Sequence, residues 1–250
     1  MIRMSSVILF VSYLLASGTT TMAENMQEYL QKTKELTRNG EYEKALERTL
    51  WFHNHALEHE PAMYGVRLSF ALGYWEDLGK VYPPAKAAMI ETRDRKLKLL
   101  QDQNGDRELF HDVVALNTRL GENSKTVKFF EELDKQHPEQ ARKYWEIAKE
   151  PVTAANRYDL VKKYIVSFDQ EFQSCKMLYK HQIEFYNKRA IGHDELKTHA
   201  ENHFIEECLT LIEVAQAIDD PTAAKSIQQK ALAVLDDPRL RKAIPTNGSE

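Results

Sequence analysis

The sequence predicts an all-α fold built from antiparallel helix pairs. Apolar residues recur at spacings of three and four along most of the 250-residue chain, as they do on one face of an α-helix. Glycine and proline are scarce, with 9 and 8 residues, whereas strand-rich folds need many turns. Breaks in the apolar pattern recur about every 15 to 20 residues, which is typical of stacked helix pairs. No run of residues has the alternating pattern of a strand.

Residues 1–23 have the order of regions found in a secretory signal peptide. Arg3 is the only charge before Glu24, and an apolar run from Val7 to Ala16 is followed by small and polar residues. The run is short for a membrane span. We expect cleavage after Ala23, with Gly18 as the second choice, and therefore a periplasmic or secreted protein. An uncleaved membrane anchor is the alternative.

The remaining chain has the composition of a globular protein. Apolar residues make up 42% and charged residues 29%, and the formal net charge is -4. No long basic block is present, so nucleic-acid binding lacks its usual electrostatic footprint. No stretch after the signal approaches the roughly 18 apolar residues of a membrane span. We therefore expect neither a nucleic-acid partner nor a membrane span in the mature chain.

Helix boundaries follow from the apolar periodicity and from Gly, Asn, Ser and Pro at its ends. In chain order we expect helices over 26–38, ended by Asn39-Gly40; from Glu41 to Pro61; over 63–81, before Pro83-Pro84; over 85–102, stopped by Asn104-Gly105; over 107–120, ended by Gly121; from a Ser124 cap to Pro138; and over 139–149, broken by Pro151.

Residues 156–189 contain neither Gly nor Pro, and their apolar positions repeat at three and four. This pattern predicts one long helix, or two helices broken near 167–169. We expect Gly192 to end it, Asp194 to cap a further helix that runs to Ile218, and a last helix from Pro221 to about Leu235. The tail over 239–250 is predicted to be flexible.

A resemblance to a known repeat family rests on Trp75-x-x-Leu78-Gly79-x-x-Tyr82. This spacing resembles the first helix of a tetratricopeptide repeat (TPR), in which a small residue lets two helices approach closely and large residues fill the space beside it. The second half of the repeat pattern is matched by Gly121, Thr126, Phe130, Leu133 and Pro138, although Ala is usual at the second and fourth of these positions.

The resemblance implies a right-handed solenoid of stacked helix pairs. We assign TPR-like repeats to 26–150 and a helical region that continues the stack, or forms a long-helix bundle, to 152–238. Trp75, Leu78, Gly79, Tyr82 and Phe130 are expected to pack the repeats. TPR proteins hold a peptide or a partner's helix in a groove lined by first helices, so Tyr74, Glu76 and Lys80 become candidate partner-binding residues. Ordinary solvated side chains are the alternative at each of them.

Two side-chain sets leave other chemistry open. His199, His203 and Glu207 share one helix face and could supply two nitrogens and a carboxylate to zinc or iron, although a further ligand from elsewhere would be needed. Cys175 and Cys208, the two cysteines of the chain, are expected on apolar faces as buried thiols, or as a disulfide if the protein is exported.

No nucleophile elbow, phosphate loop or dinucleotide fingerprint is found, so we expect no enzyme activity and no cofactor. The sequence therefore predicts an exported, non-catalytic TPR-like module or scaffold of the cell envelope that binds a protein or peptide. A metal-binding helical bundle or metalloenzyme that uses His199, His203 and Glu207 is the alternative. A structural spacer is the third possibility.

Overall fold

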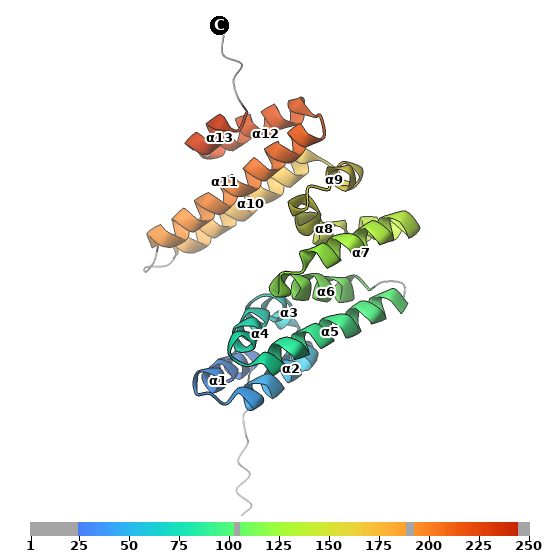
Figure 1. Cartoon of the computed structure of the whole chain (residues 1–250). Coiled ribbons are helices and arrows are strands. Elements are labelled where there is room, and N and C mark those ends of the chain that lie inside the picture. Colours follow the sequence, from blue (N-terminus) through green and yellow to red (C-terminus); the bar gives the residue numbers. More distant parts are fainter. Residues whose placement is uncertain (1–24, 103–105, 189–192, 245–250) are drawn as a thin grey trace, which may run out of the picture. The chain divides into compact units, whose positions relative to one another are not determined.

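The computed structural model describes residues 25–102, 106–188 and 193–244. Within these ranges all regular structure is helical, with thirteen α-helices, one short 3-10 helix and no strand (Figure 1). The predicted all-α class is confirmed. The signal segment 1–23, Asn104-Gly105, Gly192 and residues 245–250 lie outside the described residues.

The chain divides into two compact units, one ending at Arg67 and the other beginning at Leu68. The sequence analysis had placed its division near residue 151. Among the described residues, none of the helices combines the length and the apolar character that crossing a membrane requires.

The first unit is a helical hairpin with a short extension. α1 (Met26–Arg38) and α2 (Tyr42–His59) pack against each other, and the 3-10 helix η1 (Pro61–Met63) leads into α3 (Tyr64–Leu68). Asn25 caps α1, because its side chain accepts a hydrogen bond from the backbone nitrogen of Glu28 at 2.8 Å. Gly40 has a φ of 79°, which glycine adopts without strain, and so allows the tight turn into α2.

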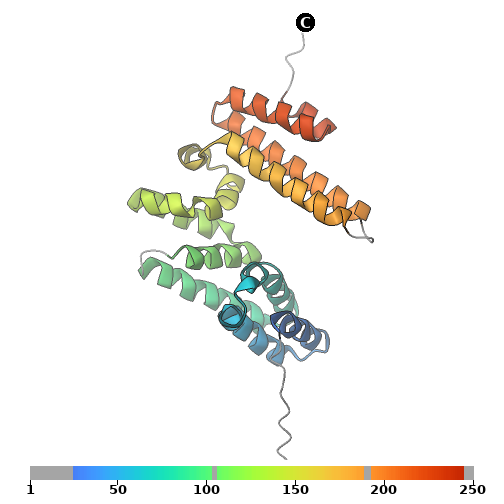
Figure 2. The ribbon, with the colours of Figure 1, turned by 180° about the vertical axis from the view of Figure 1, so that it is seen from behind.

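The second unit contains ten helices of the described chain. They are α4 (Phe70–Val81), α5 (Pro83–Asp102), α6 (Arg107–Leu120), α7 (Asn123–Gln136), α8 (Pro138–Ala154), α9 (Tyr158–Tyr164), α10 (Phe168–Asn187), α11 (His193–Ala217), α12 (Pro221–Val234) and α13 (Pro238–Lys242). From α4 to α9 each helix packs against the next, and α4 and α8 both also contact α6. Both views of the ribbon show α10 and α11 side by side as a long hairpin, which α12 joins (Figure 2).

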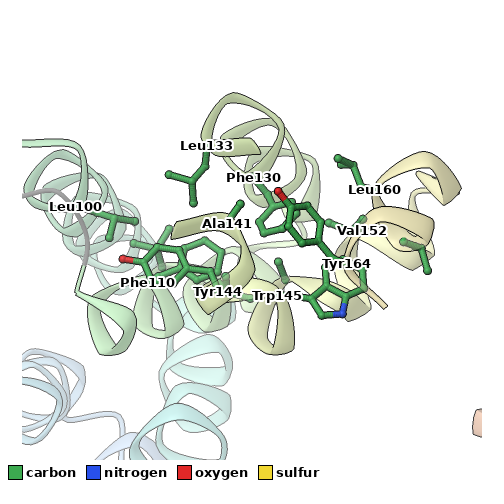
Figure 3. Packing of buried hydrophobic residues seen from close by; sticks show 14 of the residues in the cluster. Leu100, Phe110, Phe130, Leu133, Ala141, Tyr144, Trp145, Val152, Leu160 and Tyr164 are labelled. Atoms are coloured by element: carbon green, nitrogen blue, oxygen red, sulfur yellow. The ribbon is translucent and has the colours of Figure 1, made fainter. Parts of the chain in front are cut away.

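Two apolar clusters hold this unit together. The first combines side chains from α5 to α9 with Val214 of α11, and its centre is aromatic: the rings of Phe110 and Tyr144 stack at 4.6 Å, and those of Trp145 and Tyr164 at 5.7 Å (Figure 3). The second combines α10 to α13 and includes Phe172 and Phe204. Each helix thus buries a stripe that it could not bury alone.

The prediction of one continuous helix over 63–81 is wrong. The structure divides it at Ser69, whose φ and ψ of -117° and -85° are not helical. Tyr82, predicted to point inward, is only half-buried. α4 ends at Val81 and Tyr82 is extended, because the residue before a proline is disfavoured in the α region. The helical phase that would bury Tyr82 therefore stops one residue too early.

Three other predicted ends differ from the structure. Ser124 does not cap α7, which begins at Asn123. Pro151 does not break α8 but lies buried in its last turns, where the missing N–H removes a single helical hydrogen bond. Asp194 lies inside the first turn of α11, where its carboxylate interacts favourably with the helix dipole.

Two predictions for the C-terminal half can also be compared with the observed helices. The segment 156–189 forms two helices, the second of the two alternatives, and the Ser167 side chain caps α10 by accepting a hydrogen bond from the Gln170 nitrogen. The region after Pro238, predicted as a flexible tail, begins with the short helix α13. Its Leu240 is fully buried in the second apolar cluster.

Candidate functional site

The inward face of α4 is set by Trp75, Leu78 and Gly79. Trp75 is fully buried, and its Nε1 donates a hydrogen bond to the Ala85 carbonyl at 2.8 Å. A Cβ atom added at Gly79 would lie 3.3 Å from both the Cβ and the backbone nitrogen of Lys86. α4 and α5 therefore approach each other closely at Gly79.

Polar residues of α4 lie outside the face that packs on α5. Three charged side chains meet where α4 contacts α6. The Glu76 carboxylate lies 3.2 Å from Lys80 Nζ and 3.5 Å from Arg119 Nη1 of α6. Arg119 Nη2 also donates to the Ser69 carbonyl at 3.1 Å. We call Glu76, Lys80 and Arg119 the α4/α6 charged face.

Arg119 reaches α4 because Gly73 leaves space for it. The guanidinium atoms of Arg119 lie 3.7 to 3.8 Å from the point where a Cβ of Gly73 would be. Gly73 is one helical turn before Asp77 and one residue after the buried Leu72, so it faces away from α5. A long cation from α6 can therefore lie across α4 and hold the Glu76 carboxylate.

Electrostatics keep the face charged at neutral pH. A hydrogen bond to Asp77 at 2.9 Å, followed by one to Glu76, raises the pKa of Lys80 above its usual value. The guanidinium of Arg119 brings N–H donors and no acceptor to the face. Glu76 thus lies between two cations, and the face offers ionic contacts of both signs to another surface.

Tyr74 is not part of this face. It precedes Glu76 by two residues, which places it about 160° away around the helix. Of the three candidates from the sequence, the structure therefore brings Glu76 and Lys80 together and separates Tyr74 from them.

A shallow depression lies at the turn between α7 and α8. Its volume is about 840 Å³, and its lining comes from α6, the end of α7 and the start of α8. Arg107, His137 and Lys143 lie in its wall together with one carboxylate, that of Glu139. This depression is open, and its basic side chains can accept acidic groups of another chain.

The three candidate metal ligands all lie on α11, with His199 and Glu207 exposed and His203 half-buried. His203 Nε2 lies 3.9 Å from the Glu207 carboxylate. His199 and His203 line a depression whose walls come from α11 alone. Within the described ranges, no three His, Cys, Asp or Glu side chains gather closely enough to hold a metal ion. The metal-binding alternative therefore gains no support from the structure.

The strongest pKa shifts occur in the apolar clusters. Burial raises the pKa of Cys175 to about 11 and that of Cys208 to about 12. Burial, followed by the hydrogen bond to Asp134, also raises the pKa of Tyr164. Each shift keeps the group neutral, which is the opposite of what activates a thiol nucleophile.

No protein-family model matches the chain, and no curated protein matches it.

Sequence reasoning missed Arg119, which lies 43 positions after Glu76 in the chain. The one local signal was Gly73, a second small residue on α4 whose space the arginine uses. It becomes informative only when the neighbouring helix is known.

Proposed function

We propose that this chain is an exported, non-catalytic protein-binding module whose stacked helices resemble TPRs. The observation that carries the proposal is the α4/α6 charged face, in which Glu76, Lys80 and Arg119 from two helices meet at the surface. Proteins built from stacked helix pairs use such extended faces to bind other proteins.

The TPR-like arrangement is supported by the contacts of alternate helices. α4 and α8 both contact α6, as successive first helices of a repeat stack do, while α5 contacts α4 and α6, and α7 contacts α6 and α8. Gly79 supports it further, since it provides the close approach between the two helices of a pair. Export is supported by the order of charge, apolar run and small residues over 1–23.

Ionic contacts across a face of this kind set specificity and the rate of association more than raw affinity. The expected partner is therefore a protein or peptide with charges of both signs that complement Glu76 on one side and Lys80 and Arg119 on the other. Non-catalytic binding agrees with the neutral state of the two thiols, of which Cys208 is buried and Cys175 half-buried.

Capture of partners from a cell-envelope extract by the tagged chain lacking 1–23 tests the proposal. The variants are Lys80→Glu and Arg119→Glu, and the matched control is Lys225→Glu, the same charge reversal at an exposed lysine of α12. Circular dichroism checks that each variant is folded. Reversal on the face should lower the yield of a reproducible partner several-fold, since it replaces attraction by repulsion, whereas the control should keep it.

Equal yields from the wild type and both face variants would reject this face as the binding site. Tyr74→Ala forms a separate arm, because Tyr74 lies on the other flank of α4. If only this variant loses the partner, binding uses that flank and the assignment of the charged face is wrong.

A further inference from the structure

The α10/α11 hairpin has a seam whose register can be derived from ring contacts. The rings of Tyr179 on α10 and Phe204 on α11 stack at 5.0 Å, and those of Phe172 and Phe204 lie 6.3 Å apart. In an antiparallel pair, one turn backward on one helix corresponds to one turn forward on the other. One turn from the Tyr179–Phe204 stack, Cys175 therefore faces Cys208 across the seam.

Burial and electrostatics agree with this pairing. Both cysteines belong to the second apolar cluster, Cys208 fully buried and Cys175 half-buried at its edge. After burial itself, the charge of Cys175 is the next cause that raises the pKa of Cys208, which agrees with the register derived from the ring contacts. The structure holds both as free thiols, and the chain has no other cysteine.

We infer that Cys175 and Cys208 are a disulfide-forming pair that closes the α10/α11 hairpin when a small-molecule disulfide is the oxidant. The bond would join the two helices one turn from the Tyr179–Phe204 stack and would enclose residues 176–207. It needs no binding partner, so it stands or falls independently of the function proposed above.

The exchange proceeds in two balanced steps. The more accessible Cys175 attacks as a thiolate on one sulfur of the small disulfide, whose S–S bond breaks and releases one small thiol. Cys208 then attacks the Cys175 sulfur, forms the protein disulfide and expels the second small thiol. Two protein thiols are oxidised, one small disulfide is reduced, and the two protons pass to the released thiols.

Burial of Cys208 determines which intermediate should be seen. Because its thiol is buried, it meets the oxidant through Cys175 rather than directly. The raised pKa of both thiols makes the exchange slow at neutral pH and faster as pH rises. The mixed disulfide is therefore expected on Cys175.

The test exposes the purified, folded chain lacking 1–23 to oxidised glutathione, then alkylates remaining thiols in denaturant and measures the intact mass. The expected product takes up no alkylating agent, carries no glutathione and is lighter than the reduced chain by two hydrogens. It runs as a monomer without reductant, and digestion yields a peptide pair that links Cys175 to Cys208.

The single variants Cys175→Ser and Cys208→Ser are the matched controls, and circular dichroism confirms their folding. Cys208→Ser should accumulate glutathione on Cys175, whereas Cys175→Ser should keep Cys208 reduced. The wild-type result decides the inference even if a variant fails to fold. Persistent glutathione on wild-type Cys175, disulfide-linked dimers, or two thiols that remain free after prolonged oxidation would each overturn it.

Discussion

The two glycines of α4 allow a sharp test of its packing on α5. A Cβ at Gly79 would lie 3.3 Å from backbone and side-chain atoms of Lys86, whereas a Cβ at Gly73 would meet only the flexible end of Arg119, at 3.7 Å or more. Replacing a helical glycine by alanine stabilises a helix by about 1 kcal/mol when space permits. Forcing extra atoms into a packed interface costs about 1–3 kcal/mol.

We therefore expect Gly73→Ala to stabilise the protein by about 0.5–1 kcal/mol. Gly79→Ala should be neutral or destabilise by up to about 2 kcal/mol, since overpacking offsets the helical gain. Gly79→Val adds more atoms and a β-branched side chain, and should destabilise by about 2–4 kcal/mol.

The assay is urea unfolding followed by circular dichroism, with the three variants and the wild type measured side by side. Midpoints are compared at equal slope, because a changed slope indicates a changed extent of unfolding. If Gly79→Val unfolds at the wild-type midpoint, or Gly79→Ala gains as much as Gly73→Ala, the close approach of α4 and α5 at Gly79 is refuted.

Three further outcomes follow from the contacts of the second unit. Trp75→Phe removes the indole hydrogen bond and part of a buried ring, so the free energy of unfolding should fall by about 1–3 kcal/mol in the same urea assay. Hydrogen bonds from Lys125 and then Arg93 lower the pKa of Glu122 below 4.5. The stability from Glu122 is therefore complete above that pH and lost as pH falls through the lower, folded-state pKa, so melting temperatures of Glu122→Gln should fall less steeply than wild type in that range. The oxidised cysteine pair should add about 3–4 kcal/mol of stability over the reduced chain in urea, and no shift of the midpoint on oxidation would contradict a closed hairpin.

Helix positions could be predicted from the sequence where the local signals and the packing agree. α6 is the clearest case: Asp106 caps its start, Gly121 ends it in the left-handed conformation at φ 70°, and Phe110 and Val113 are buried between these ends. Nothing from another helix was needed to place it.

Prediction failed where tertiary contacts outweigh local signals. Pro151 looks like a helix end, but it is buried and followed by the fully buried Val152, so packing in the first cluster offsets the single lost hydrogen bond. Conversely, the helix breaks at Ser69, although no Gly or Pro stands at 66–69. The nearest such residue before the break is Gly65, so the sequence carries no clear stop at Ser69. Leu240 was missed because a five-residue helix has too little periodicity to detect.

The candidate site was predictable only in part, for a geometric reason. Helical periodicity places Glu76 and Lys80 on one side of α4, because residues four apart share a face. It also separates Tyr74 from them, which the sequence interpretation did not use. Arg119 depends on which helix packs beside α4, and periodicity within one helix carries no information about that neighbour.

The most direct measurement for the proposed binding face is site-specific photo-crosslinking. A photoreactive residue at Asp77, 66% exposed, removes one hydrogen bond to Lys80 but keeps the side chains of Glu76, Lys80 and Arg119, and one at Lys225 on α12 serves as the control. After illumination with envelope extract, we predict one defined protein adduct at position 77 that Arg119→Glu abolishes, and no such adduct at position 225. The same adducts at both positions, or none at position 77, would contradict the assignment of the α4/α6 charged face as the surface that binds a partner.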